Sequence, residues 1–247
     1  KPLPAADPLV DKCIECGFCE PVCPSEGLTL SPRQRIVIWR HIQAKKRAGE
    51  DTTELETAYQ YHGLDTCAAT GLCADRCPVD INTGDLVRKL RAEKTRHPGT
   101  ANWIAEHFQS VVRGTRLVLT MASGVEKLMG APRLAKVSAG ISRMSGNRLP
   151  QWDPSMPQPV RFVPPTPVTE SDAPRVVYFA ACVARVMGPA SGDAEQTTLY
   201  DKTRQLLQKG GYQVVHPDGL DSFCCGQPWA SKGYPEQAER KKAELFK

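Results

Sequence analysis

CIECGFCEPVCP, residues 13–24, is a complete C-x2-C-x2-C-x3-C-P run. A second stretch, CAATGLCADRCP at residues 67–78, repeats the run, but Thr70 stands where its second cysteine is expected. The complete run is typical of bacterial proteins that bind two iron–sulfur clusters, in which the fourth cysteine of a run ligates the other cluster. The two stretches therefore predict that the chain holds two clusters and carries electrons.

The spacing predicts crossed ligation between the runs. Three thiolates separated by two residues each allow one loop to present sulfur to three irons, whereas the fourth cysteine lies too far along the chain to close the same cluster. The proline that follows disfavours helix at that cysteine. The predicted ligands of one [4Fe–4S] cluster are Cys13, Cys16, Cys19 and Cys77.

The second cluster is predicted to be ligated by Cys23, Cys67 and Cys73. Three thiolates favour a [3Fe–4S] cluster, because threonine is not a usual ligand of iron. The alternative is a second [4Fe–4S] cluster whose fourth ligand is the Thr70 oxygen or a water. The sequence leaves this cluster type open.

Other uses of the cysteines fit the pattern less well. The seven cysteines of the two runs cannot all form disulfides with one another, and no segment resembles a signal peptide. A zinc site would favour two C-x2-C knuckles rather than this interlocking spacing. Ten cysteines without a secretory leader indicate a reducing compartment, so we expect a cytoplasmic protein. A structural or sensory role for the clusters is the non-enzymatic alternative.

The order of helical signals predicts a mainly α chain that begins with a helical ferredoxin domain at residues 1–97. A first helix is expected to start at Ser31-Pro32, because serine caps a helix and proline suits its first turn. A second is expected from Thr52 or Thr53 to Tyr61, ending near Gly63, and a third over residues 80–95. A helical extension is predicted at residues 98–148.

Residues 149–174 contain eight prolines and predict a semi-rigid linker between domains. After it, a strand at 175–180, a helix at 198–209 and a strand at 212–215 predict the start of a truncated α/β domain at residues 175–247. Lys1 in place of Met and the charged end at Lys247 lead us to expect a piece of a longer polypeptide.

Cys182 and the Cys224-Cys225-Gly226 stretch follow the two expected strands. Because the ends of parallel strands meet at one edge of a sheet, these cysteines form a candidate redox or third-cluster site. The alternative is that they are small buried residues, as free cysteines often are. We identify no catalytic residue, since His41, His62, His97, His107 and His216 are scattered along the chain.

The net charge of +5 is unevenly placed. Residues 98–149 hold only two acidic residues, Glu106 and Glu126, and seven basic ones: Arg113, Arg116, Lys127, Arg133, Lys136, Arg143 and Arg148. This excess indicates either a solvated helix face or peripheral contact with an anionic membrane. No aromatic residues alternate with the basic ones, so we expect no nucleic-acid partner. The sequence contains no run of eighteen apolar residues, so we expect no transmembrane helix.

The paired runs resemble those of the iron–sulfur subunit of succinate dehydrogenase and fumarate reductase, which holds one [4Fe–4S] and one [3Fe–4S] cluster. The order of domains, a helical ferredoxin followed by a linker and a Cys-Cys-Gly domain, is more similar to that of iron–sulfur proteins of glycolate oxidase, anaerobic glycerol-3-phosphate dehydrogenase and heterodisulfide reductase. The stretches CIECGFCEPVCPS, SPRQRI and DTCAATGLCADRCPVDINTGDLVRKLR resemble the C-terminal half of FAD-linked, NAD-independent D-lactate dehydrogenases most.

That resemblance implies a flavin domain outside this chain, in the same polypeptide or in a partner subunit. FAD there would oxidise a D-2-hydroxy acid, and the clusters here would pass the electrons to a quinone or cytochrome at the inner face of the cell membrane. The alternative is a separate iron–sulfur subunit of a glycolate or glycerol-3-phosphate dehydrogenase, or of a heterodisulfide-reductase-like complex.

Overall fold

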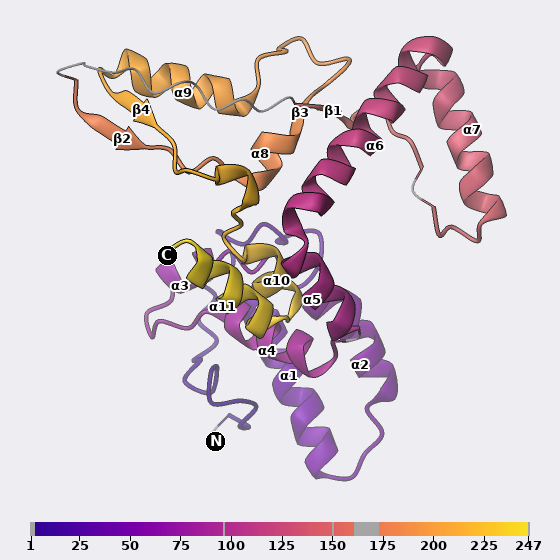
Figure 1. The fold of residues 1–247 in the computed structure, drawn as a ribbon. Helices are drawn as coiled ribbons and strands as arrows, with labels where there is room; N and C mark the ends of the chain where they lie inside the picture. Colours follow the sequence, from indigo (N-terminus) through magenta and orange to yellow (C-terminus); the bar gives the residue numbers. More distant parts are fainter. Residues whose placement is uncertain (1–2, 96, 150, 161–172, 247) are drawn as a thin grey trace. The chain divides into compact units, whose positions relative to one another are not determined.

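The computed structural model describes residues 3–95, 97–149, 151–160 and 173–246. These residues form two compact units, Lys1–Asn102 with Gly226–Arg240, and Trp103–Cys225 with Lys241–Lys247. Helices dominate both units, as Figure 1 shows, so the mainly α prediction is confirmed. The ferredoxin and Cys-Cys-Gly assignments and the domain limits stay predictions. Residues 150 and 161–172 of the predicted linker lie outside the described residues.

The first unit is helical in all its described elements, and α5 and α11 begin in it and end in the second unit. Its helices are α1 (Pro32–Arg47), α2 (Thr53–Tyr59), the π-helical turn η1 (Gln60–Asp65), α3 (Leu72–Asp75), α4 (Thr83–Glu93), α5 (Pro98–Glu106), α10 (Gln227–Lys232) and α11 (Pro235–Glu244).

The start of α1 follows its sequence signals. The Ser31 hydroxyl accepts a hydrogen bond from the Gln34 amide, and the Gln34 side chain accepts one from the Ser31 amide at 2.9 Å. This capping box satisfies two amides that the first helical turn leaves without partners. Pro32 occupies the first helical position. The first helix therefore begins where the sequence predicts.

The second helix continues beyond its predicted end. Helix α2 runs into η1, which extends to Asp65 instead of stopping near Gly63. Gly63 does not terminate the helix, because it does not adopt the positive φ of a C-terminal glycine. It lies instead against the Tyr59 ring, which an added Cβ would approach to 2.4 Å. The third helix, α4, is shorter than predicted: Asn82 caps it, and the positive φ of Asp80 (54°) lies outside the helical region.

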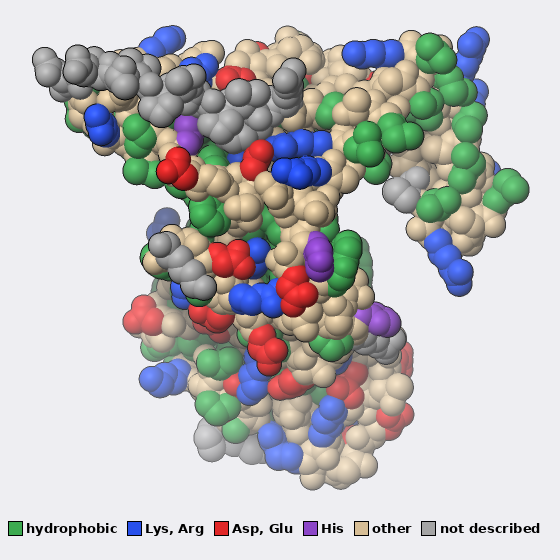
Figure 2. All heavy atoms as spheres, viewed as in Figure 1, with side chains coloured by type: hydrophobic (Ala, Val, Ile, Leu, Met, Phe, Trp, Pro, Cys, Tyr) green, Lys and Arg blue, Asp and Glu red, His purple; other side chains and the backbone are tan. Residues whose placement is uncertain are grey.

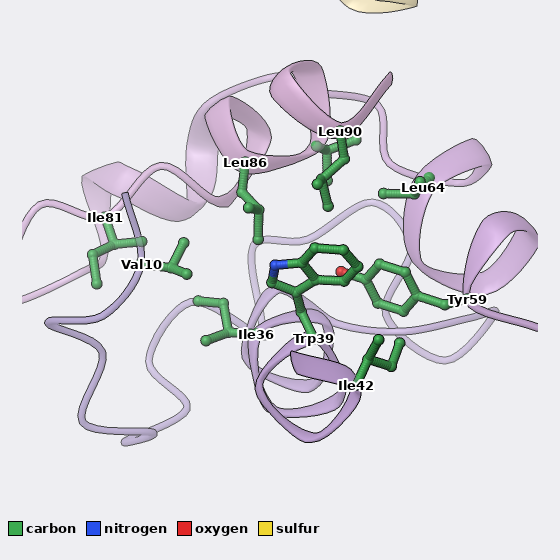
Figure 3. Packing of buried hydrophobic residues seen from close by; sticks show 10 residues of the cluster. Val10, Ile36, Trp39, Ile42, Tyr59, Leu64, Ile81, Leu86 and Leu90 are labelled. Atoms are coloured by element: carbon green, nitrogen blue, oxygen red, sulfur yellow. The ribbon is translucent and has the colours of Figure 1, made fainter. Parts of the chain in front are cut away.

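A hydrophobic cluster holds the first unit together (Figure 3). Trp39 stacks on Tyr59 with ring centroids 5.6 Å apart, and Leu86 and Leu90 of α4 point toward the Trp39 ring. Cys13, Cys67 and Cys77 pack against this cluster. Helices α1, α2 and α4 therefore form a rigid base for both cysteine runs. Its buried members are Val10, Ile36, Trp39, Ile42, Tyr59, Leu64, Ile81, Leu86, Val87 and Leu90.

The segment Gly226–Arg240 packs on the first unit although it follows the second cysteine run by many residues. The Trp229 indole donates to the Ala101 carbonyl at 3.3 Å, and Arg91 donates to the Ser231 carbonyl. Gly233 (φ 86°) lies against the backbone of Arg91 and Ala92, where a Cβ would come within 2.6 Å of the Ala92 nitrogen. No local sequence pattern predicts this long-range packing.

The second unit combines helices with two small sheets. Strands β2 (Arg175–Val177) and β4 (Gln213–Val215) pair in parallel, as predicted for the strand–helix–strand pattern. The first strand is shorter than the predicted 175–180, and its Val177 is exposed. The remaining elements are α6 (Phe108–Met129), α7 (Ala131–Met144), β1 (Pro157–Pro159), α8 (Cys182–Val186), β3 (Met187–Ala190), α9 (Leu199–Lys209) and η2 (Leu220–Ser222).

Candidate iron–sulfur centres

Two pockets in the first unit are lined by the cysteines of the two runs. The first, pocket A, brings Cys77 of the second run together with three cysteines of the first run, Cys13, Cys16 and Cys19. The space without atoms in and around it, open solvent included, is about 370 Å³. Ile36 of α1 and Ile81 form part of its apolar wall. Its donor set is four thiols, which suits a cluster that needs one sulfur for each of four irons.

The second, pocket B, brings Cys23 of the first run together with Cys67 and Cys73 of the second. The space without atoms in and around it, open solvent included, is about 340 Å³, and Thr70 also lines it. The Thr70 hydroxyl accepts a hydrogen bond from the Leu72 amide at 3.5 Å. Pocket B therefore offers three thiols and one hydroxyl. These donors suit either a [3Fe–4S] cluster or a [4Fe–4S] cluster with one ligand that is not cysteine.

The two pockets are neighbours, because the fully buried Thr83 lines both. Thr83 is the first residue of α4, and the first turn of α1 contributes Arg33 to pocket A and Pro32 to pocket B. Two helix N-termini therefore border the pockets. The positive dipole ends of these helices favour negative charge, as thiolate-bound clusters carry.

Two arginines donate hydrogen bonds to backbone carbonyls of the cysteine loops. Buried Arg40 of α1 donates to the carbonyls of Asp11 and Cys13 at 3.2 and 2.9 Å and pairs with Glu15 at 2.6 Å. Arg91 of α4 donates to the Cys67 carbonyl at 2.7 Å. Each loop is thus fixed to a helix by contacts that do not involve its sulfurs.

Burial raises the pKa of the Cys19 thiol to about 11. Because thiolate is the form that binds metal, loading of pocket A must displace this proton. Within the described residues, no three His, Cys, Asp or Glu side chains converge closely enough to hold a single metal ion. In a cluster each thiolate binds a different iron, so its sulfurs lie farther apart than the ligands of one ion.

The cysteines of the second unit are only partly brought together. Cys224 is buried and forms a hydrogen bond with Cys182 at the start of α8, whereas Cys225 is exposed. This hydrogen bond lowers the pKa of the Cys182 thiol to about 6, and the positive charge of Arg185 adds to the shift. Cys182 is therefore the reactive member of the pair near neutral pH.

Arg185 is a residue that sequence reasoning missed. Its guanidinium is buried and donates to the carbonyls of Ala180 at 3.1 Å and Phe223 at 2.7 Å. It thereby fixes the backbone on either side of the Cys182–Cys224 pair. No spacing in the sequence distinguishes this arginine from an exposed one.

Comparison with known families agrees with the chemistry of the first unit. Residues 9–81 match the family described as a 4Fe-4S dicluster domain. This region holds both cysteine runs. The prediction of an iron–sulfur redox protein is confirmed at this level, whereas the ligand of each iron and the cluster types stay predictions.

Similarities over a larger part of the chain are to subunits of glycolate oxidase and of heterodisulfide reductase. The probable glycolate oxidase iron-sulfur subunit of Bacillus subtilis (strain 168) is 24% identical over 87% of this chain and 48% of its own length. A subunit of the dihydromethanophenazine:CoB–CoM heterodisulfide reductase of Methanosarcina acetivorans is 26% identical over 88% and 46%. The glycolate oxidase iron-sulfur subunit of Escherichia coli (strain K12) is 27% identical over 43% and 26%.

The chain thus spans about half the length of the relatives from Bacillus subtilis and Methanosarcina. No solved structure matches it. Among the helices of the described residues, none has the length and apolar content to cross a bilayer.

Proposed function

We propose that this chain is the electron-transfer region of a flavin-dependent dehydrogenase that oxidises a 2-hydroxy acid. The observation that carries the proposal is the pair of pockets A and B, whose thiols come from both runs and which share the wall residue Thr83. Clusters in the two pockets would accept and release one electron at a time. Neighbouring one-electron sites suit a relay between a two-electron flavin donor and a separate acceptor.

The substrate class is proposed from two independent similarities. The stretches around the cysteine runs resemble D-lactate dehydrogenases of the FAD-linked type, and two of the relatives are iron–sulfur subunits of glycolate oxidase. D-lactate and glycolate are both 2-hydroxy acids, so we propose this class, with D-lactate as the first substrate to test. FAD would be bound outside this chain, and a quinone or cytochrome would receive the electrons.

A second candidate is a subunit of a heterodisulfide-reductase type. It is favoured by the relatives from Methanosarcina, which match 88% of this chain or more. The Cys182–Cys224 pair suits either candidate, as a redox-active thiol pair or as part of a third cluster site. An iron–sulfur subunit of a glycerol-3-phosphate dehydrogenase belongs to the same group of alternatives.

We also propose that helices α6 and α7 lie on an anionic membrane surface at the cytoplasmic side. Leu117, Met121 and Leu128 share one face of α6, because they recur at spacings of four and seven residues, and all are exposed. On α7, exposed Val137, Ile141 and Met144 recur at spacings of four and three residues and so also share one face. Figure 2 shows hydrophobic side chains gathered over these two helices.

Basic residues accompany this apolar surface: Arg113, Lys127, Arg133, Lys136 and Arg143. An apolar helix face beside lysine and arginine side chains is the arrangement of helices that lie in the membrane interface. Such a position would bring the chain to the bilayer, where a lipid-soluble quinone is found.

The experiment that tests the relay uses the anaerobic protein together with its native flavin domain or flavoprotein partner. D-lactate, glycolate, glycerol 3-phosphate and a dithiol are added separately, and cluster absorbance and electron paramagnetic resonance are followed within one turnover. Bleaching by D-lactate or glycolate is the expected result. Reduction by the dithiol alone would favour the heterodisulfide type, and no reduction by any donor would contradict the relay.

A further inference from the structure

Arg35 is a fully buried cation that contacts a predicted cluster ligand. Its side chain is 1% exposed, and its Nη1 donates to the Cys23 Sγ at 3.7 Å in pocket B. Its Nε donates to the Gly63 carbonyl at 2.7 Å, and its Nη2 to the Thr66 hydroxyl at 3.3 Å. The acceptors of the guanidinium are thus a carbonyl, a hydroxyl and a thiol sulfur. Within the described residues no carboxylate pairs with it.

Among the described residues that line pocket A, none is a buried cation without a carboxylate partner. Arg33 lines it, but Arg33 lies partly in solvent and its Nε pairs with Glu20 at 3.2 Å. Buried Arg40 reaches the backbone of the Cys13 loop, and its charge is balanced by Glu15 at 2.6 Å. These two cations near pocket A are therefore compensated by carboxylates, whereas Arg35 at pocket B is not.

This asymmetry has an electrostatic consequence. Reduction adds one negative charge to a cluster, and a fixed positive charge nearby stabilises the reduced form, more so where solvent does not screen it. Hydrogen bonds to ligand sulfur act in the same direction, because they withdraw electron density from the cluster. Both effects favour an electron in pocket B over one in pocket A.

We propose that Arg35 is a redox-tuning residue that raises the reduction potential of the pocket B cluster above that of the pocket A cluster. The inference rests on the proposed function, in that both pockets hold clusters. One electron then leaves the reduced pocket A cluster, which is oxidised, and reduces the pocket B cluster, without making or breaking a covalent bond. Electrons entering from the flavin side collect in pocket B before they reach the acceptor.

The test is a redox titration of the cluster-loaded protein, followed by electron paramagnetic resonance. The Cys77→Ser variant assigns signals to pockets. In the unmodified protein the pocket B signal is expected to disappear or appear at the higher potential. Arg35→Gln removes the charge and the sulfur contact, and is expected to shift the pocket B potential downward while the pocket A potential stays in place. Arg35→Lys keeps the charge and is expected to give a smaller shift.

Arg40→Gln is the matched control, because Arg40 is a buried arginine of the same helix that donates to backbone carbonyls and a carboxylate instead of sulfur. It is expected to leave the pocket B potential unchanged. An unchanged pocket B potential in a fully loaded Arg35→Gln protein would overturn the proposal. So would a lower potential for pocket B than for pocket A in the unmodified protein, a result that needs no variant to fold. Iron and sulfide analysis separates these outcomes from failure of the proposed function, which would show as absent clusters.

Discussion

Cys23 belongs to the first cysteine run, yet it lines the same pocket as Cys67 of the second run. The exchange is reciprocal, since Cys77 of the second run lines the pocket of Cys13, Cys16 and Cys19. The two loops are therefore interlocked, and each candidate centre depends on residues far apart in the chain. This arrangement makes the loss of a single thiol informative.

Replacement of Cys77 by serine is expected to remove or damage the cluster of pocket A while that of pocket B persists. The reason is that the lost sulfur belongs to the donor set of Cys13, Cys16 and Cys19. Iron and sulfide content with electron paramagnetic resonance before and after dithionite measures the effect. Cys23→Ser is the matched control and should affect pocket B instead. Loss of the pocket B cluster in the Cys77 variant would contradict crossed ligation.

Thr70→Cys is expected to supply a fourth thiolate to pocket B, because Thr70 already lines it beside Cys23, Cys67 and Cys73. A [3Fe–4S] cluster should become [4Fe–4S] and its reduction potential should fall, since a further thiolate adds negative charge. The sharp electron paramagnetic resonance signal expected of an oxidised [3Fe–4S] cluster should then be absent. Thr70→Val serves as the control of similar shape. Identical spectra for the Cys and unmodified proteins would place Thr70 away from the cluster.

Alkylation of Cys182 should depend on pH with a midpoint near 6. The pKa of this thiol is lowered to about 6 by its hydrogen bond with Cys224, so the thiolate predominates above pH 6. Below the midpoint the rate should fall about tenfold per pH unit, because thiolate is the nucleophile. Mass spectrometry after iodoacetamide pulses measures the rate.

The Cys224→Ala variant should move this midpoint upward, because it removes the hydrogen bond that favours the Cys182 thiolate. Alkylation at pH 7 then becomes slower. Cys225→Ala is the control and should leave the midpoint in place, since Cys225 is exposed and does not contribute to the shift. Equal midpoints in all three proteins would show that the Cys224 contact does not form.

Gly63→Ala should destabilise the chain by about 1–3 kcal/mol, the usual cost of an added methyl group in a packed site. The added Cβ would lie 2.4 Å from the Tyr59 ring, which stacks on Trp39 and cannot move without disturbing the core. Denaturant unfolding followed by tryptophan fluorescence measures the change. Gly99→Ala in α5 is the control, because beyond its chain neighbours and the backbone of its own helix nothing lies within 4 Å of the added methyl group. Equal stability of both variants would contradict the tight packing at Gly63.

The protein should sediment with vesicles that contain anionic phosphatidylglycerol and stay in solution with vesicles of phosphatidylcholine. The apolar faces of α6 and α7 and their basic residues both contribute, so binding should weaken as salt rises. Leu128→Gln should reduce binding, since Leu128 is 90% exposed on the proposed contact face. Leu206→Gln on α9, which removes a leucine that is 70% exposed, should not. Equal losses in both variants would argue against a specific face.

Much of the first unit could be predicted from short-range signals. Ser31 and Pro32 mark the start of α1, Asn82 caps α4, and the spacing of Leu86, Val87 and Leu90 gives its buried face. These features depend on residues within one or two helical turns. The π-helical turn η1 was missed because a glycine often ends a helix in a left-handed conformation, whereas Gly63 does not have a positive φ and packs against the Tyr59 ring.

The arginines could not be predicted, because their roles depend on what the fold places beside them. Arg33 and Arg35 are two residues apart in the SPRQRI stretch, but Arg33 pairs with Glu20 near solvent and Arg35 is buried against Cys23. A helix turns such neighbours to different sides. In the second unit, Arg185 likewise gains its importance only from the carbonyls of residues distant in sequence.

The packing of Gly226–Arg240 on α4 bears on the order in which the protein is made. A ribosome releases both cysteine runs long before it adds Trp229 and Gly233. The first unit therefore cannot complete its packing until the whole of Trp103–Cys225 has been synthesised. Until then the surface of α4 that this segment covers is exposed to solvent. Clusters inserted at this stage would bind to cysteine loops whose supporting helices are not yet fully packed. Truncation before Gly226 would therefore leave the iron–sulfur region without part of its own structure.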